Sequence, residues 1–220
     1  MPRAETDYSD GLASLKDRTM HRYLKYGLIE NVDTVRRVRL GTFWGVAISA
    51  TPIAWLNPAI FGGLRLLLGL TRELSLPDRL TDAALFALAV QVATLVHAGG
   101  HILGGKLVGS AMDELLITAT RDVNRYAGDQ TVLPGYVHFG RAFGGPAANL
   151  IVYGLCAALL SGLPAGLGHD LGSQIMSVNQ FFGLGGFLPL PSVDGAVIWR
   201  EVWRALRQRA AAKSGDDPAS

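Results

Sequence analysis

The sequence predicts an all-α integral membrane protein with about four transmembrane helices and a short membrane-associated β segment. Two compositional observations support this fold class: 49% of the 220 residues are hydrophobic and only 17% are charged, whereas a typical soluble domain has about 25% charged residues. The third observation is the pattern. Four apolar segments are long enough to cross the hydrocarbon core of a bilayer, and one stretch between them alternates as strands do.

The N-terminal part of the chain divides into a leader and a first span. Residues 1–42 are polar and rich in Lys and Arg, and we expect them to form a cytoplasmic leader. The first predicted span, 43–70, is interrupted by Pro52 and Pro58, so it would cross the membrane kinked or tilted.

The second predicted span, 83–109, contains two histidines in an apolar background. A polar link precedes it, and Asp82 at the end of this link is a candidate N-cap.

The next stretch, 110–142, has the pattern of strands and not that of a spanning helix. Its segments "DELLITAT" and "YVHFGRA" alternate and contain β-branched or aromatic residues, so we expect two or three short strands joined by loops.

Two further spans and a tail complete the predicted organisation. The third span is expected over 143–167 and the fourth over 172–190. The fourth helix is expected to end in "LPLPSVDG", because its prolines interrupt a helix. The tail, 196–220, places apolar residues beside Arg and Glu at helical spacing, which predicts an amphipathic helix at the membrane surface.

The distribution of Lys and Arg predicts the orientation in the membrane. With four spans and the N-terminus inside, nearly all Lys and Arg lie in cytoplasmic segments, and the outer loops hold only Arg72 and Arg79. We therefore expect an integral protein of a prokaryotic plasma membrane with both termini in the cytoplasm. The net charge of +2 does not suggest a nucleic-acid partner, so the expected partner is the lipid bilayer. The single cysteine, Cys156, forms no disulfide framework and no cysteine metal site.

Three residues form a candidate metal site. His97 and His101 are four residues apart, so on a helix their side chains share one face. The predicted topology brings Asp194, at the end of the fourth span, to the same side of the membrane. Two histidines and one carboxylate with an open fourth position are typical of a catalytic zinc site. The alternative is a pair of histidines that hydrogen-bond across the bundle or face the lipid headgroups.

These residues lie in three stretches that resemble, in the same order, motifs of the site-2 protease family of intramembrane zinc metalloproteases. "HAGGH" (97–101) is similar to H-E-x-G-H, and "GGPAANLIV" (144–152) is similar to the G-P-x-x-N stretch that opens the next core helix. "GFLPLPSVDGA" (186–196) is similar to N-L-L-P-x-P-P-L-D-G-G. The resemblance covers about 83–200, with the β segment over 110–142, and it implies a site-2 protease-like core.

The resemblance also implies roles for individual residues. It implies zinc ligands at His97, His101 and Asp194, and substrate contacts at Asn149 and at position 186. The implied partners are transmembrane protein substrates or partner helices.

The sequence departs from the family pattern at two positions. Ala98 stands where the family has the glutamate that acts as general base, and Gly186 stands where it has an asparagine. General acid–base help contributes about 10²–10⁴ to the rate, so peptide hydrolysis is expected to be very slow. Asp113 and Glu114 are candidate replacement bases or solvated loop carboxylates. His138 either faces the site from the β segment or pairs with a backbone group.

Two explanations of Ala98 remain open. It is either an engineered change that traps an inactive enzyme or the native residue of a non-catalytic member, and the second departure at Gly186 favours the native explanation. Three functions follow: an intramembrane zinc protease inactive as written, a pseudoprotease that binds transmembrane segments or lipids, and a membrane scaffold whose histidines are only structural.

Overall fold

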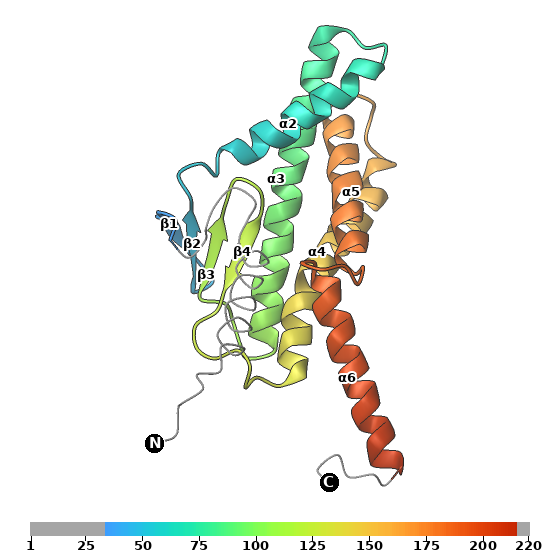
Figure 1. Ribbon diagram of the computed structural model, residues 1–220. Coiled ribbons are helices and arrows are strands. Elements are labelled where there is room, and N and C mark those ends of the chain that lie inside the picture. The colour runs from blue at the N-terminus through green and yellow to red at the C-terminus, as the bar shows by residue number, and fades with distance from the viewer. Residues whose placement is uncertain (1–33, 215–220) are drawn as a thin grey trace, which may run out of the picture.

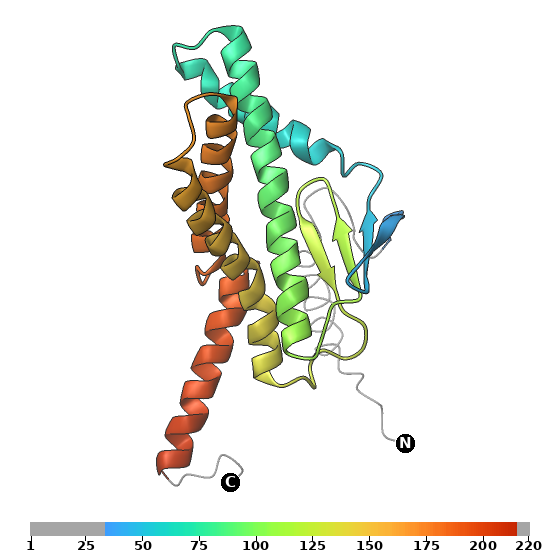
Figure 2. The same ribbon diagram turned by 180° about the vertical axis from the view of Figure 1, so that it is seen from behind.

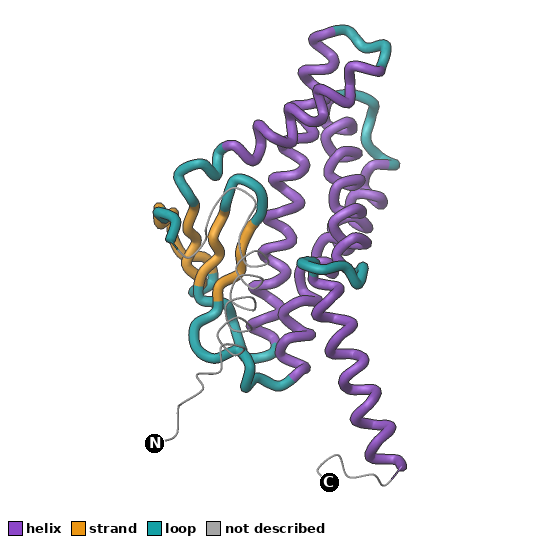
Figure 3. The backbone as a smooth tube through the Cα atoms, viewed as in Figure 1, coloured by secondary structure: helices purple, strands orange, loops and turns teal. Residues whose placement is uncertain are grey.

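The computed structural model describes residues 34–214, which form a helical bundle with a small sheet against one side (Figure 1). Helices α4 and α5 lie on one side of the long helix α3, and the sheet lies on the other side, as both views show (Figures 1 and 2). Helix α2, continued by the short 3₁₀ helix η1, crosses obliquely to the upper end of α3 (Figure 3). The helices are α2 (Leu56–Leu68), η1 (Gly69–Thr71), α3 (Leu76–Leu107), α4 (Gly135–Leu160), α5 (Leu167–Gly186) and α6 (Asp194–Ser214).

The sheet has four strands in the order β1-β2-β3-β4. The two outer pairs, β1 with β2 and β3 with β4, are antiparallel hairpins, and β2 pairs with β3 in parallel. The strands are β1 (Val38–Phe43), β2 (Val46–Ala50), β3 (Glu114–Ile117) and β4 (Asp122–Arg125). Two strands, β3 and β4, therefore lie within the predicted β segment 110–142, and the other two were not predicted.

The prediction of a single span over 43–70 is wrong. Its first part is the strand β2, and only α2 and η1 are helical. Trp44 and Gly45 both have positive φ, 51° and 82°, at the turn between β1 and β2, as a tight hairpin turn of the primed type requires. The predicted leader 1–42 is also partly strand, since β1 begins at Val38; its residues 1–33 lie outside the described part of the chain.

The start of α3 also differs from the prediction. The helix begins at Leu76, and Ser75 is its N-cap, with Ser75 Oγ accepting from the backbone N–H of Asp78. Asp82, the predicted cap, lies inside the helix. It forms an ion pair with Arg65 of α2 at 2.7 Å and accepts a hydrogen bond from Gln174 of α5 at 2.8 Å. Asp82, the last residue of the predicted link, thus connects α3 to both α2 and α5.

Helix α4 starts earlier than the predicted third span, because residues 135–142 are helical rather than a strand. The backbones of α3 and α4 approach closely through small residues: a Cβ added at Gly100 would collide with the carbonyl of Gly144, and one at Gly104 with that of Gly140. Small residues permit such contacts between membrane helices. This close approach positions α4 against the histidines of α3.

Among the described residues, α3 and α4 are long and apolar enough to cross a membrane. Helix α2 with η1 is apolar but shorter, and α5 does not meet the same criterion, so only two of the four expected spans have this support. The predicted amphipathic tail is the helix α6, which begins two residues earlier than expected and extends away from the bundle (Figure 1).

Candidate metal centre

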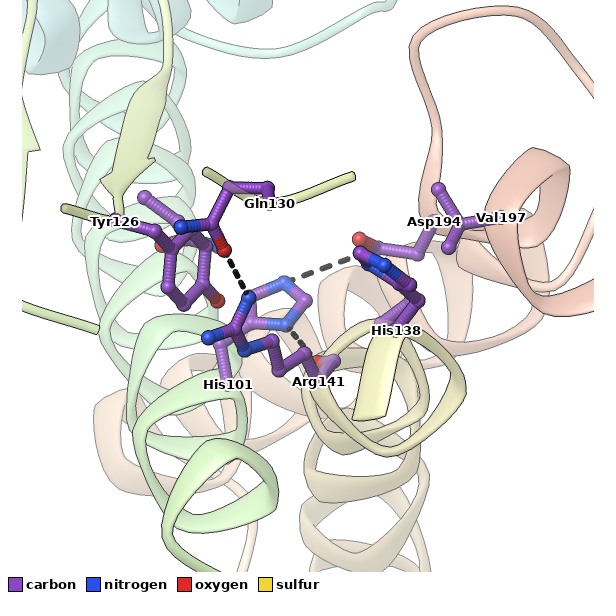
Figure 4. Close-up of a pocket in the computed structure, with 9 residues that line it drawn as sticks. His101, Tyr126, Gln130, His138, Arg141, Asp194 and Val197 are labelled. Atoms are coloured by element: carbon purple, nitrogen blue, oxygen red, sulfur yellow. Dashed lines mark hydrogen bonds and ion pairs between the residues drawn. The ribbon is translucent and has the colours of Figure 1, made fainter. Parts of the chain in front are cut away.

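The three predicted ligands converge at one point between α3 and the first turn of α6. Suitable ligand atoms of His97, His101 and Asp194 all lie within 4.8 Å of one another. Asp194 Oδ2 is 3.0 Å from Nε2 of His97 and 3.4 Å from Nε2 of His101. Figure 4 shows the imidazole of His101 directed at the Asp194 carboxylate.

The segment between α5 and α6 presents Asp194 to the histidines. Pro189 and Pro191 interrupt the helical path, and α6 restarts at Asp194 itself. Gly195 lies so close to the carbonyl of Leu188 that a side chain there would collide with it. The turn is also held by Trp199, whose Nε1–H donates to the Phe187 carbonyl at 2.9 Å.

Both histidines are oriented through Nδ1, the ring nitrogen that does not face Asp194. Nδ1–H of His97 donates to Oδ1 of Asn149 at 2.6 Å, and Nδ1–H of His101 donates to the backbone carbonyl of Arg141 at 2.7 Å. Because each Nδ1 keeps its proton, each Nε2 is the nitrogen available to a metal. Metal-binding histidines are commonly fixed in this way.

The site also contains space for an ion. A Cβ added at Gly145 of α4 would lie 2.6 Å from Nε2 of His101 and 2.7 Å from Nε2 of His97, so the missing side chain leaves open the volume that both nitrogens face. Ligands bound tetrahedrally at about 2.0–2.1 Å from one zinc ion are about 3.3 Å apart, close to the two distances from Asp194. The donor set and the space therefore fit zinc.

The carboxylate of the site is held in its ionised form. Burial disfavours the charge of Asp194, but the hydrogen bonds from His101 and His97 outweigh burial and lower the pKa of the carboxyl to about 2. A deprotonated carboxylate is the form that binds a metal.

Position 98 offers no proton acceptor. Ala98 is only 3% exposed and belongs to the apolar cluster between α3 and the sheet. We call this group the sheet-side cluster; its buried members are Val46, Ala98, Ile102, Met112 and Leu115. The methyl group of Ala98 is therefore part of the packing between helix and sheet.

The candidate replacement bases have other partners. Asp113 accepts a hydrogen bond from the backbone N–H of Ala127 at 2.6 Å, and Glu114 pairs with both Arg37 and Arg125. His138 lies on α4 rather than on a strand, and it lines one pocket together with His101 and Asp194 (Figure 4).

Arg141 organises the wall of this pocket. Its guanidinium lies 3.8 Å from the centre of the Tyr126 ring and donates to Gln130 and to the backbone carbonyl of Ser110. Its own carbonyl accepts from His101. Arg141 thus connects His101, a predicted metal ligand, to the loops on both sides of the β3–β4 hairpin, and the sequence analysis did not identify this role.

The two positions expected to contact substrate are buried between helices of the bundle. Asn149 is fully buried behind His97, and Gly186 at the end of α5 is buried against Pro146 of α4. Asn149 also donates to Oδ1 of Asn179, a second buried asparagine that the sequence analysis missed. A polar residue inside a predicted span is a signal that could have identified Asn179.

Comparison with known proteins supports this architecture. No family model and no curated protein matches the chain. Among solved structures, the site-2 protease from Methanocaldococcus jannaschii is similar with a TM-score of 0.54 and 16% sequence identity, covering 76% of this chain and 72% of that one. The chain has a site-2 protease-like fold. Together with the apolar helices α3 and α4, the site-2 protease-like fold indicates a membrane protein.

Proposed function

We propose that this chain is a site-2 protease-like membrane protein that binds zinc through His97, His101 and Asp194 and lacks peptidase activity. One observation carries the proposal: the three ligands converge, whereas the position of the general base is the buried methyl group of Ala98. When bound, zinc supplies a Lewis acid that can polarise a carbonyl or water oxygen. No group at position 98 can accept or return the proton that hydrolysis requires.

The packing supports a native rather than an engineered alanine. Ala98 packs among the apolar side chains of the sheet-side cluster, and Gly186 packs against Pro146. At both positions where the sequence departs from the family pattern, the small residue present thus fits its neighbouring side chains. An enzyme inactivated by one engineered change would depart only at position 98.

The proposed partners are the lipid bilayer and transmembrane segments of other proteins, which the bundle would bind without cutting. The proposed location is a prokaryotic plasma membrane with both termini in the cytoplasm. Lys106 lies in the last turn of α3, and α6, which extends from the same end of the bundle (Figure 1), carries five basic residues: Arg200, Arg204, Arg207, Arg209 and Lys213. This concentration of basic residues supports the orientation.

Metal analysis and a cleavage assay together test the proposal. The purified protein, reconstituted with zinc in detergent, should retain about one ion per chain, and His101→Ala should retain much less. A panel of single-span fusion proteins should remain intact with the zinc-loaded protein, while an active site-2 protease serves as the positive control.

Each contrary result has a defined meaning. If the wild-type protein binds no zinc, the histidines are only structural and the remaining function is that of a membrane scaffold. Cleavage that a zinc chelator stops would show that another residue supplies proton transfer and that the protein is an enzyme.

A further inference from the structure

The metal ligand His97 is connected to α5 by two buried asparagines. Nδ1–H of His97 donates to Oδ1 of Asn149 at 2.6 Å, and Nδ2 of Asn149 donates to Oδ1 of Asn179 at 2.7 Å. Nδ2 of Asn179 in turn donates to the backbone carbonyl of Ile175 at 2.8 Å. Both asparagine side chains are fully buried.

The direction of this hydrogen-bond chain is fixed by backbone carbonyls, which only accept. The Ile175 carbonyl requires the NH₂ group of Asn179 on its side, so the amide oxygen of Asn179 must face Asn149. Asn149 then faces two acceptors, Asn179 Oδ1 and the carbonyl of Ala93 at 3.0 Å. Its NH₂ group must point to them, and its oxygen must point to His97.

The orientation of Asn149 decides which nitrogen of His97 can bind a metal. An amide oxygen facing Nδ1 keeps the proton on Nδ1 and leaves Nε2 free to act as a ligand toward Asp194. A flipped amide would present its NH₂ group to Nδ1, so Nδ1 would have to accept and the neutral ring would carry its proton on Nε2. A ring in that form cannot bind the metal through Nε2.

We propose that Asn179 is a positioning residue, which through Asn149 holds His97 in the tautomer that binds the metal. This inference rests on the proposed zinc site and adds a residue from α5, a helix that contributes no ligand. Ala93 alone provides a single acceptor, which the amide of Asn149 can leave when it rotates. The second acceptor on Asn179 removes that freedom.

Zinc affinity, measured by competition with a chromophoric chelator, is the first readout. Asn179→Leu keeps a similar volume without an acceptor and should weaken binding about 10–100-fold, as expected for the loss of an outer-shell partner. Asn179→Asp keeps an oxygen for Asn149 and, when protonated, an O–H for the Ile175 carbonyl, so it should bind zinc more tightly than Asn179→Leu. Gln174→Leu, on the same helix but bonded to Asp82 away from the site, is the matched control and should bind zinc as the wild type does.

A second background separates positioning from general packing. In Asn149→Leu the side chain has no amide to orient, so position 179 can no longer act on His97 through it. Adding Asn179→Leu to this background should leave zinc affinity unchanged. If Asn179 acts only through packing, the loss of affinity would persist in the double variant.

Proton exchange at His97 tests the inference without metal. In ¹⁵N NMR spectra of the zinc-free protein, with the signal assigned by its absence in His97→Ala, the Nδ1 proton should exchange slowly in the wild type and fast in Asn179→Leu. A wild type that binds no zinc but shows this difference would refute the proposed metal function and uphold the positioning role. Equal exchange and equal zinc affinity in wild type and Asn179→Leu would overturn the inference.

Discussion

Gly186, the last residue of α5, lies against Pro146 in α4 so closely that a Cβ at position 186 would be 2.6 Å from Pro146 Cγ. The family that the sequence resembles has asparagine at this position. An asparagine here cannot enter without moving α5 away from α4. Because α5 leads directly into the turn that presents Asp194, the contact between Gly186 and Pro146 also helps to position this predicted metal ligand.

Substitution of Gly186 should therefore destabilise the bundle. Gly186→Ala is expected to lower the stability by about 1–3 kcal/mol, the range for overpacking a well-packed interior. Thermal unfolding in detergent measures the effect. Gly185→Ala is the matched control, since a Cβ there meets nothing within 4 Å. Equal unfolding temperatures for the two variants would contradict the close contact.

Gly145 should be essential for metal binding although it supplies no ligand. In Gly145→Ala the added methyl group would occupy the space faced by Nε2 of both His97 and His101. Zinc retention measured by elemental analysis should fall to the level of His101→Ala. Gly154→Ala, on the same helix with open space around it, should retain zinc. Full zinc occupancy in Gly145→Ala would place the ion elsewhere.

A glutamate at position 98 should destabilise the protein rather than activate it. Ala98→Glu inserts a carboxylate into the sheet-side cluster, and burying a charge without a partner is expected to cost at least about 2 kcal/mol. Ala98→Met, which adds similar length without charge, separates the effect of charge from that of size in thermal unfolding.

The same variant also tests whether only the base is missing. We expect zinc-loaded Ala98→Glu to leave a transmembrane substrate intact. If it cleaves the substrate, and the double variant with His97→Ala does not, the rest of the catalytic site is competent and the loss is confined to position 98.

The convergence of the ligands was predictable because much of the signal is local. His97 and His101 share a helix face by spacing alone, and the prolines before Asp194 mark the end of a helix. The strands β1 and β2 were not predictable in the same way. The run from Phe43 to Ala50 is as apolar as a span. Its strand β2 lies between β1, its hairpin partner, and β3, and the parallel pairing with β3, far away in the sequence, leaves no local pattern.

The residues that orient the ligands were also beyond the sequence analysis. Arg141 holds His101 through its backbone carbonyl, and any residue type has such a carbonyl. Asn179 acts through another asparagine from a different helix. Neither contact corresponds to a recognisable spacing of residues in the sequence, because each depends on how α3, α4 and α5 pack together.

The orientation in the membrane is tested by cysteine labelling after Cys156 is replaced by alanine. Exposed positions serve as sites: Glu73 between η1 and α3 and Asp170 in the first turn of α5 on one side, Asp129 in the loop before α4 and Gln208 on α6 on the other. In intact cells a membrane-impermeant maleimide should label Glu73→Cys and Asp170→Cys. The other two variants should react only after permeabilisation. Labelling of Gln208→Cys in intact cells would reverse the proposed orientation.

Asp122, the first residue of β4, should make the stability of the protein depend on pH. Burial raises the pKa of its carboxyl from 3.8 to about 6, and the electrostatic effect of the nearby His97 ring offsets burial only in part. The folded state therefore binds more protons than the unfolded state between about pH 4 and pH 6, so stability falls as the pH rises through this window. Above it, the folded protein carries a partly buried charge that the unfolded chain leaves in water.

Replacing Asp122 by asparagine should remove this penalty. Chemical unfolding in detergent at pH 7.5 should find Asp122→Asn more stable than the wild type by about 1–2 kcal/mol, allowing for the partial exposure of the side chain. Near pH 4 most of the difference should vanish, because the wild-type carboxyl is then protonated. Asp129→Asn is the control, since Asp129 is exposed and its hydrogen bonds from Thr131 lower its pKa, so its replacement should not stabilise the protein at pH 7.5. A constant difference between wild type and Asp122→Asn from pH 4 to pH 7.5 would show that the carboxyl of Asp122 does not titrate in this window.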